Sequence, residues 1–175
     1  MIYVLIGLLA IIALVLIAAA MKPNTVHYER STVINAPPER ILPHVADFHK
    51  WSAWSPWDKL DPGMKRSFSG AESGVGARYA WVGNKKVGEG TMEVLEAGPQ
   101  AVKIDLRFLK PWKSECITHV RFSPQAGGTQ VRWEMDGPNL FMGKVFSLFV
   151  NMDKMIGKDF ETGLAGLKAV AEKNG

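Results

Sequence analysis

The sequence has little cysteine and no concentrated positive charge, and both shortages narrow the classes of protein to which it can belong. Cys116 is the only cysteine among 175 residues, so the chain can form no internal disulfide and no cysteine-rich zinc site. The net charge is +4, and the 21 Lys and Arg residues form no basic run, which gives little support to nucleic-acid binding. Internal repeats and low-complexity tracts are also absent. These shortages favour a globular domain over a disulfide scaffold or a repeat array.

Charge is missing altogether from residues 1–21, where Tyr3 is the only polar side chain. Twenty helical residues span roughly 30 Å, the thickness of the hydrocarbon core of a bilayer. A core helix would show a polar face, and a signal peptide usually has a basic start and a shorter apolar stretch. Ala18 and Ala20 resemble a cleavage site, so a signal peptide is the alternative. The sequence predicts a single transmembrane helix over residues 1–21.

The charges that follow this helix bear on which side of the membrane the rest of the chain lies. Lys22, Arg30 and Arg40 come after it, whereas only the amino group of the chain precedes it. The positive-inside rule therefore favours the cytoplasmic side. Residues 22–25 are expected to be a short linker. Residues 26–175 are expected to form one domain, long enough to bury a core without disulfides or metal.

Apolar residues recur at every second position through much of this domain. Residues 26–34 have the composition of a strand, and residues 35–39 have the asparagine, prolines and glutamate of a helix start. Residues 49–63, with three tryptophans and two prolines, are expected to be irregular. Between residues 75 and 135, five alternating runs separated by turn residues predict an antiparallel meander with one apolar face. The opposite, wet face would carry Glu93, Asp105, Glu115, His119 and Glu134.

The spacing changes to three and four in the last part of the chain. Apolar residues between 141 and 167 follow this spacing, which predicts one long amphipathic helix packed on the apolar face of the sheet. Gly157, Gly163 and Gly166 lower the helix propensity of this segment, and they indicate close approach of its backbone to another element.

The order of these elements and several short motifs resemble a known family. The motifs are INAPPE at residues 34–39, WSAWSPW at 51–57, GEG at 88–90 and DFE at 159–161. Residues 26–172 resemble the START-like (SRPBCC) superfamily, and within it the polyketide cyclase/dehydrase and lipid-transport family. The resemblance implies an α+β helix-grip fold with a cavity between the sheet and the C-terminal helix. It also implies binding of hydrophobic small molecules, with catalysis in some members only, and family members often carry an N-terminal membrane helix.

Given this resemblance, the candidate ligand-binding residues are those on the apolar face of the predicted sheet and helix. An apolar wall rich in aromatic and Met side chains suits an apolar ligand, although the same residues could instead fill a solid core. The strand candidates are Tyr79, Trp81, Met92, Ile104, Leu106, Phe108, Thr118, Val120, Trp133 and Met135. The helix candidates are Phe149, Met152 and Ile156.

Three tryptophans within seven residues stand out in the irregular segment. Trp51, Trp54 and Trp57 each carry a large apolar area that rarely stays fully exposed. They could cover the core beneath the first strand, gate the mouth of the cavity, or contact lipid in the manner of an aromatic belt.

Catalytic and metal sites find little support in the sequence. No His, Asp or Glu falls on the predicted inward face of the strands, so no residue is assigned to proton transfer. His44 and His49 are five residues apart, which does not match helical metal ligands, and no metal or cofactor is predicted. The sequence favours membrane-anchored binding or transport of an apolar, lipid-like molecule. The alternatives are a cyclase/dehydratase-type enzyme acting on a polyketide-like ligand and a stress-related protein-interaction module.

Overall fold

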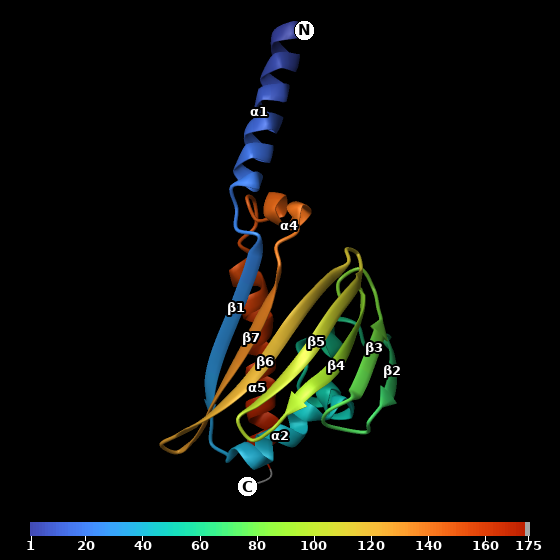
Figure 1. The fold of residues 1–175 in the computed structure, drawn as a ribbon, viewed down its shortest axis with the longest axis vertical. Helices are drawn as coiled ribbons and strands as arrows, with labels where there is room; N and C mark the ends of the chain where they lie inside the picture. The colour runs from blue at the N-terminus through green and yellow to red at the C-terminus, as the bar shows by residue number, and fades with distance from the viewer. Residues whose placement is uncertain (174–175) are drawn as a thin grey trace.

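The computed structural model describes residues 1–173 and shows a seven-stranded antiparallel sheet that curves around one long helix (Figure 1). The order across the sheet is β1-β7-β6-β5-β4-β3-β2. Consecutive strands from β2 to β7 are therefore neighbours, and β1 closes the far edge against β7. This is the predicted α+β helix-grip fold. The strands are β1 (Thr25–Ile34), β2 (Lys65–Gly70), β3 (Ala77–Val82), β4 (Glu89–Ala97), β5 (Ala101–Lys110), β6 (Ser114–Gln125) and β7 (Gly128–Pro138).

The helices fall into three groups. One helix within residues 1–173, α1 (Ile2–Ala20), is long and apolar enough to cross a membrane, and it projects from the end of the domain (Figure 1). Three short helices connect β1 to β2: α2 (Pro38–Ala46), the 3₁₀ helix η1 (Phe48–Ala53) and α3 (Pro56–Leu60). After β7 come α4 (Phe141–Phe146) and α5 (Met152–Glu172). The predicted domain range of 26–175 includes residues 174 and 175, which lie outside the described residues.

The register of the central strands agrees with the predicted alternation. Thr118 pairs with Met135, and Val120 pairs with Trp133. Paired residues share a face of the sheet, and all four side chains are buried. Ile104, opposite Thr118, is fully buried as well. The apolar face of the sheet is therefore the one that was predicted.

Two segments differ from the prediction. Strand β2 was not expected, because all six of its residues are exposed and none supplies a buried alternation. Residues 49–63, expected to be irregular, contain most of η1 and all of α3. The first turn of η1 is capped by Asp47, whose carboxylate accepts a hydrogen bond from the His49 N–H at 3.0 Å.

The single long helix predicted for residues 141–167 is in fact two helices. The side chain of Asn151 accepts a hydrogen bond from the Lys154 N–H at 2.9 Å, so a new helix begins at Met152. Phe149 lies in the break between α4 and α5, and 72 % of its surface is exposed. Periodicity alone did not reveal this break, because apolar residues continue through it at helical spacing.

The glycines of α5 mark close backbone contacts, as predicted. A Cβ on Gly163 would lie 2.7 Å from Cζ3 of Trp133, and one on Gly166 would lie 2.6 Å from the carbonyl oxygen of Trp54. A side chain on Gly157 would occupy the space of the Arg30 guanidinium. Glycine at these positions lets α5 lie directly on the tryptophan cluster and on β1.

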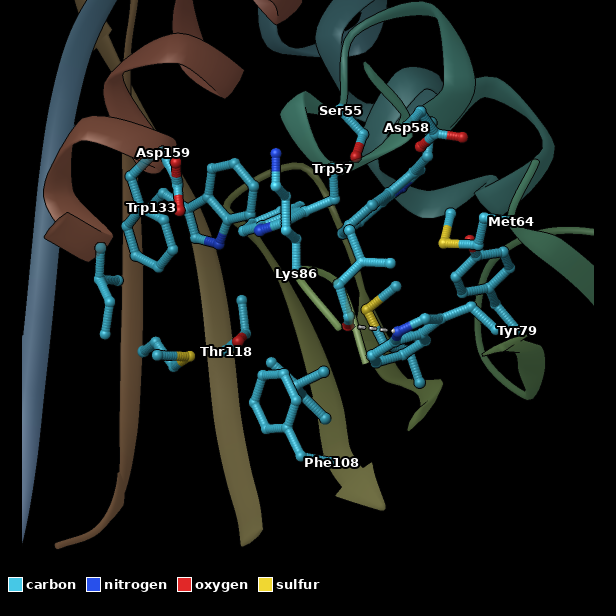
Figure 2. A pocket seen from close by; sticks show the side chains of 18 residues that line it. Ser55, Trp57, Asp58, Met64, Tyr79, Lys86, Phe108, Thr118, Trp133 and Asp159 are labelled. Carbon is cyan, nitrogen blue, oxygen red and sulfur yellow. Dashed lines mark hydrogen bonds between the residues drawn. The ribbon is translucent and has the colours of Figure 1, made fainter. Parts of the chain in front are cut away.

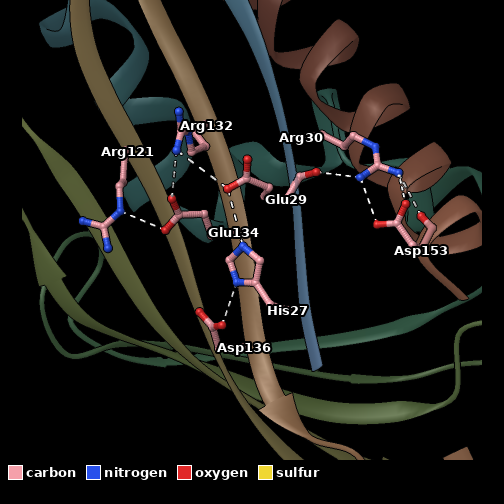
Figure 3. Close-up of polar contacts among 8 residues, drawn as sticks. All are labelled: His27, Glu29, Arg30, Arg121, Arg132, Glu134, Asp136 and Asp153. Atoms are coloured by element: carbon pink, nitrogen blue, oxygen red, sulfur yellow. Dashed lines mark hydrogen bonds and ion pairs between the residues drawn. The ribbon is translucent and has the colours of Figure 1, made fainter. Parts of the chain in front are cut away.

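Arg30 of β1 holds the first half of α5 against the sheet edge (Figure 3). Its Nη2 lies 2.9 Å from Oδ2 of Asp153, and its Nε lies 2.9 Å from Oε1 of Glu161. The hydrogen bond from Arg30 lowers the pKa of Asp153. These contacts fix the position of α5, which forms one wall of the candidate site.

Candidate functional site

A cavity of about 250 Å³ lies between the apolar face of the sheet, α3 and the first half of α5 (Figure 2). Its volume is close to the lower end of the range for small-molecule sites, roughly 300–1,000 Å³. Most of its wall is aromatic, aliphatic or Met side chain. The cavity therefore suits a compact, mostly apolar molecule.

The structure brings nine of the thirteen candidate ligand-binding residues to this cavity. These are Tyr79, Trp81, Met92, Leu106, Phe108, Thr118, Trp133, Met135 and Ile156. Trp81 is fixed in the wall by its indole N–H, which donates to the Val87 carbonyl at 3.1 Å. Burial of Tyr79 raises the pKa of its phenol to about 12.

The other four candidates lie elsewhere. Ile104 and Val120 face inward but are fully packed in the core below the cavity. Met152 packs against the edge of the core, one turn before Ile156. Phe149 is exposed because it lies in the break between the two helices.

The three tryptophans of residues 51–57 have different positions. Trp54 is in the core, where its indole N–H donates to the His44 carbonyl at 3.0 Å. Trp51 donates to the Val45 carbonyl at 2.9 Å and reaches the cavity with its ring. Trp57 is half-buried in the cavity wall, with its ring edge-on to that of Trp133 at 5.7 Å between centroids. Trp54 thus lies in the core, whereas Trp51 and Trp57 border the cavity.

Four polar residues that were not predicted also line the cavity: Ser55, Asp58, Lys86 and Asp159. Asp58 forms an ion pair with Arg66. Asp159 has no ion-pair partner among residues 1–173, and burial raises the pKa of its carboxyl group. The helical spacing contained a signal for Asp159, because it lies three residues after Ile156 and next to the buried Phe160.

Two polar groups inside the cavity have no hydrogen-bond partner among the described residues. They are Oγ1 of Thr118 and Nε1 of Trp133, whose residues are 4 % and 3 % exposed. The other buried indoles, those of Trp51, Trp54 and Trp81, each donate to a backbone carbonyl. Figure 2 shows the Trp133 nitrogen and the Thr118 side chain facing the same space, from adjacent strands. The cavity thus has two unpartnered polar groups, close to each other, in a mostly apolar wall.

The charges on the opposite face of the sheet are satisfied by one another (Figure 3). Nε of Arg121 lies 2.8 Å from Oε2 of Glu134, and Nδ1 of His27 lies 2.7 Å from Oδ1 of Asp136. Glu134, expected to face water, is covered by this pairing and is buried. His119 is half-buried on the same face, and burial lowers its pKa. Because the sheet separates these groups from the cavity, they do not belong to the site.

A curved antiparallel meander that grips a C-terminal helix over an apolar cavity defines the START-like class of ligand-binding domains. The family comparison is more specific. Residues 25–172 match the family model for polyketide cyclase / dehydrase and lipid transport proteins, and the chain belongs to this family.

Solved structures of similar fold include proteins of different origin. A protein from Chromobacterium violaceum has a TM-score of 0.59 and 20 % identity, over 86 % of this chain and 99 % of that one. A protein of unknown function from Staphylococcus aureus has a TM-score of 0.62 and 13 % identity, over 86 % and 95 %. The di-domain ARO/CYC protein StfQ from the steffimycin biosynthetic pathway has a TM-score of 0.62 and 10 % identity, over 86 % and 52 %. No curated protein sequence matches the chain.

Proposed function

We propose that this protein binds a compact, mostly apolar small molecule carrying a hydrogen-bond acceptor, and that α1 holds it at a membrane. The observation that carries the proposal is the aromatic cavity with the unpartnered donors of Thr118 and Trp133 inside it. A ligand that fills the cavity excludes water, so it must bond to these groups itself or leave them unpaired at a cost of about 1–3 kcal/mol. An interaction module with a filled core would have no such space.

Fluorenone and fluorene form a matched pair of probes for this site, because they share a flat fused-ring shape and differ in one carbonyl oxygen. Binding would be measured by quenching of tryptophan fluorescence in the full chain, reconstituted in lipid nanodiscs and corrected with empty nanodiscs. Fluorenone is expected to bind roughly five-fold more tightly, the equivalent of one neutral hydrogen bond. Thr118→Val should reduce this preference without weakening fluorene binding, and Trp133→Phe, which removes the indole N–H, should reduce it as well.

Leu106→Trp is the control for the location of the probe, because the larger ring would fill the cavity. It should abolish binding of both probes, whereas Leu109→Trp, on the exposed end of the same strand, should not. Binding that survives Leu106→Trp would place the probe outside the cavity and refute the proposal.

The membrane part of the proposal rests on α1, which is apolar along its whole length and largely unburied by the rest of the protein. The full chain is expected to stay with the membrane fraction after washing with alkaline carbonate. Recovery of the intact, uncleaved chain in the soluble fraction would contradict the anchor.

One observation favours a second candidate, a cyclase- or dehydratase-type enzyme. Asp159 lines the cavity and its pKa is raised by burial, which moves it toward the range useful for general acid–base catalysis. To test this candidate, a linear poly-β-ketone thioester would be incubated with the protein. Mass spectrometry would follow the cyclised and dehydrated products. Accelerated conversion that Asp159→Asn abolishes would support the enzyme, and equal conversion with and without protein would exclude this reaction for that substrate.

A further inference from the structure

Large apolar side chains are exposed together at one place outside α1. Leu140, Phe141, Met142, Phe146 and Phe149 fall within ten residues, and each is between 42 % and 72 % exposed. Single exposed apolar residues are normal on protein surfaces. Five large ones within ten residues of the chain mark a surface that meets something apolar. We call residues 140–149 the α4 knob.

The α4 knob is held at the point where α1 leaves the domain (Figure 1). Asn139 donates from its backbone N–H to the Asn24 carbonyl at 2.8 Å, and from Nδ2 to the Pro23 carbonyl at 2.9 Å. Nζ of Lys144 donates to Oδ1 of Asn24 at 2.6 Å. Ala19, in the last turn of α1, is fully buried. Pro23 and Asn24, between α1 and β1, are therefore bound to Lys144 of the knob and to Asn139 just before it, so this segment is not a free tether.

The outer surface of the knob carries no exposed charge. Lys144 is the only charged residue between 140 and 149, and it is buried with its ammonium group turned toward Asn24. The outward groups are phenyl, thioether and isobutyl. Aromatic and apolar side chains of this kind lie favourably at the boundary between lipid headgroups and acyl chains.

From these contacts we infer that the α4 knob inserts into the interface of the bilayer that α1 spans. The inference rests on the proposed membrane role of α1 and adds a second, lateral contact to it. Two points of contact would fix the orientation of the domain, which a single helix and a flexible linker could not do.

This orientation would place one end of the sheet next to the lipid. Thr25 pairs with Pro138 at the end of β1 and β7 nearest α1, and Glu89 pairs with Lys110 at the same end of β4 and β5. The loop between β3 and β4 lies at this end (Figure 1) and contributes Lys86 to the cavity wall. A ligand dissolved in the membrane would then meet the cavity from its nearest end.

The inference can be tested with a fluorophore attached to the full chain in liposomes of phosphatidylcholine and phosphatidylglycerol. The emission wavelength of the fluorophore reports whether it lies in lipid or in water. The variants Met142→Cys and Phe149→Cys would each carry the dye NBD at the added cysteine, and the chain with only its buried Cys116 would be the labelling blank. Ile6→Cys, within α1, is the positive control. Ala126→Cys, in the β6–β7 turn at the opposite end of the sheet, is the negative control.

The labels at 142 and 149 are expected to emit at shorter wavelength than the label at 126, and to be quenched by brominated lipid but not by iodide in the buffer. Water-like emission at 142 and 149, together with lipid-like emission at 6, would overturn the inference and leave the anchor intact. Water-like emission at 6 would contradict the anchor itself. A shift at 142 that grows with the protein-to-lipid ratio would show that a second copy covers the knob, and it would also overturn the inference.

Discussion

The unpartnered Thr118 hydroxyl in the cavity can be tested by measuring unfolding free energies. A second buried threonine, on the neighbouring strand, provides the comparison. Thr118 on β6 and Thr129 on β7 are 4 % and 0 % exposed. The Thr129 hydroxyl donates to the Ala36 carbonyl at 2.7 Å, whereas the Thr118 hydroxyl has no partner among residues 1–173. The same substitution, Thr→Val, replaces a hydroxyl with a methyl group of similar size at both positions.

The two substitutions should have opposite effects on the free energy of unfolding. Thr129→Val removes a hydrogen bond and leaves the Ala36 carbonyl without this donor, which should destabilise the protein by about 1–3 kcal/mol. Thr118→Val removes a hydroxyl that folding takes out of bulk water without a protein partner. It should be neutral or stabilise the protein by up to about 1 kcal/mol.

Urea unfolding of the full chain in a mild nonionic detergent, followed by tryptophan fluorescence and far-UV circular dichroism, would measure both effects. The comparison is valid if the m-value, the slope of the unfolding free energy against urea concentration, is the same in the two variants. If Thr118→Val destabilised the protein as much as Thr129→Val, the Thr118 hydroxyl would be bonded in the folded protein. The cavity would then have no unpaired hydroxyl to offer a ligand.

Three further perturbations test the register, the helix contact and the surface charges. Ile104→Asp should destabilise the protein by more than about 3 kcal/mol, because it buries an unpaired carboxylate. Asp105→Ser, on the opposite face of the sheet, should lower the unfolding free energy by less than about 1 kcal/mol in the same urea assay. Reversed effects would mean that the strand register is wrong by one residue. Gly163→Ala should destabilise the protein, since the new Cβ would lie 2.7 Å from an indole carbon of Trp133. This effect should exceed the gain of about 1 kcal/mol that alanine brings to a helix over glycine. A rise in the thermal midpoint would show that α5 does not lie so close to Trp133. The hydrogen bond to Asp136 raises the pKa of His27 above 6.5, so its contribution to stability is complete below pH 6.5 and is lost as the pH rises through the raised pKa. His27→Gln should therefore lower the unfolding free energy below pH 6.5 and have little effect at about pH 8. An equal loss of stability in both pH ranges would contradict this pairing.

The strand half of the fold was predictable because one face of the sheet is buried and the other is wet. Val120 and Trp133, for example, could be placed inward from alternation alone, and they are paired and buried. Strand β2 could not be found in this way, because it lies at the edge of the sheet with both faces exposed. It pairs with β3 along its whole length, but no buried residue alternates with an exposed one in its sequence.

The candidate site was predictable only where it is built from strands. Phe149 was expected in the cavity because its spacing fits a helix, but the Asn151 cap starts a new helix after it. Asp159 was missed although it lies three residues after the predicted wall residue Ile156, and Lys86 was missed because its access to the cavity depends on how the β3–β4 loop packs against the sheet. Such tertiary placement is not encoded in a local period.

The two halves of α5 explain why a cavity persists in a core with so many large side chains. In the second half, Gly163 and Gly166 let the helix backbone approach the tryptophans, and just before it Phe160 stacks on Trp133 with 4.6 Å between ring centroids. That half is close-packed. In the first half, Ile156 is only partly buried and borders the cavity, while Arg30 holds the helix at the edge strand β1. The helix is thus fixed at both ends of its contact with the sheet, and the space under its first half cannot collapse without breaking one of these attachments.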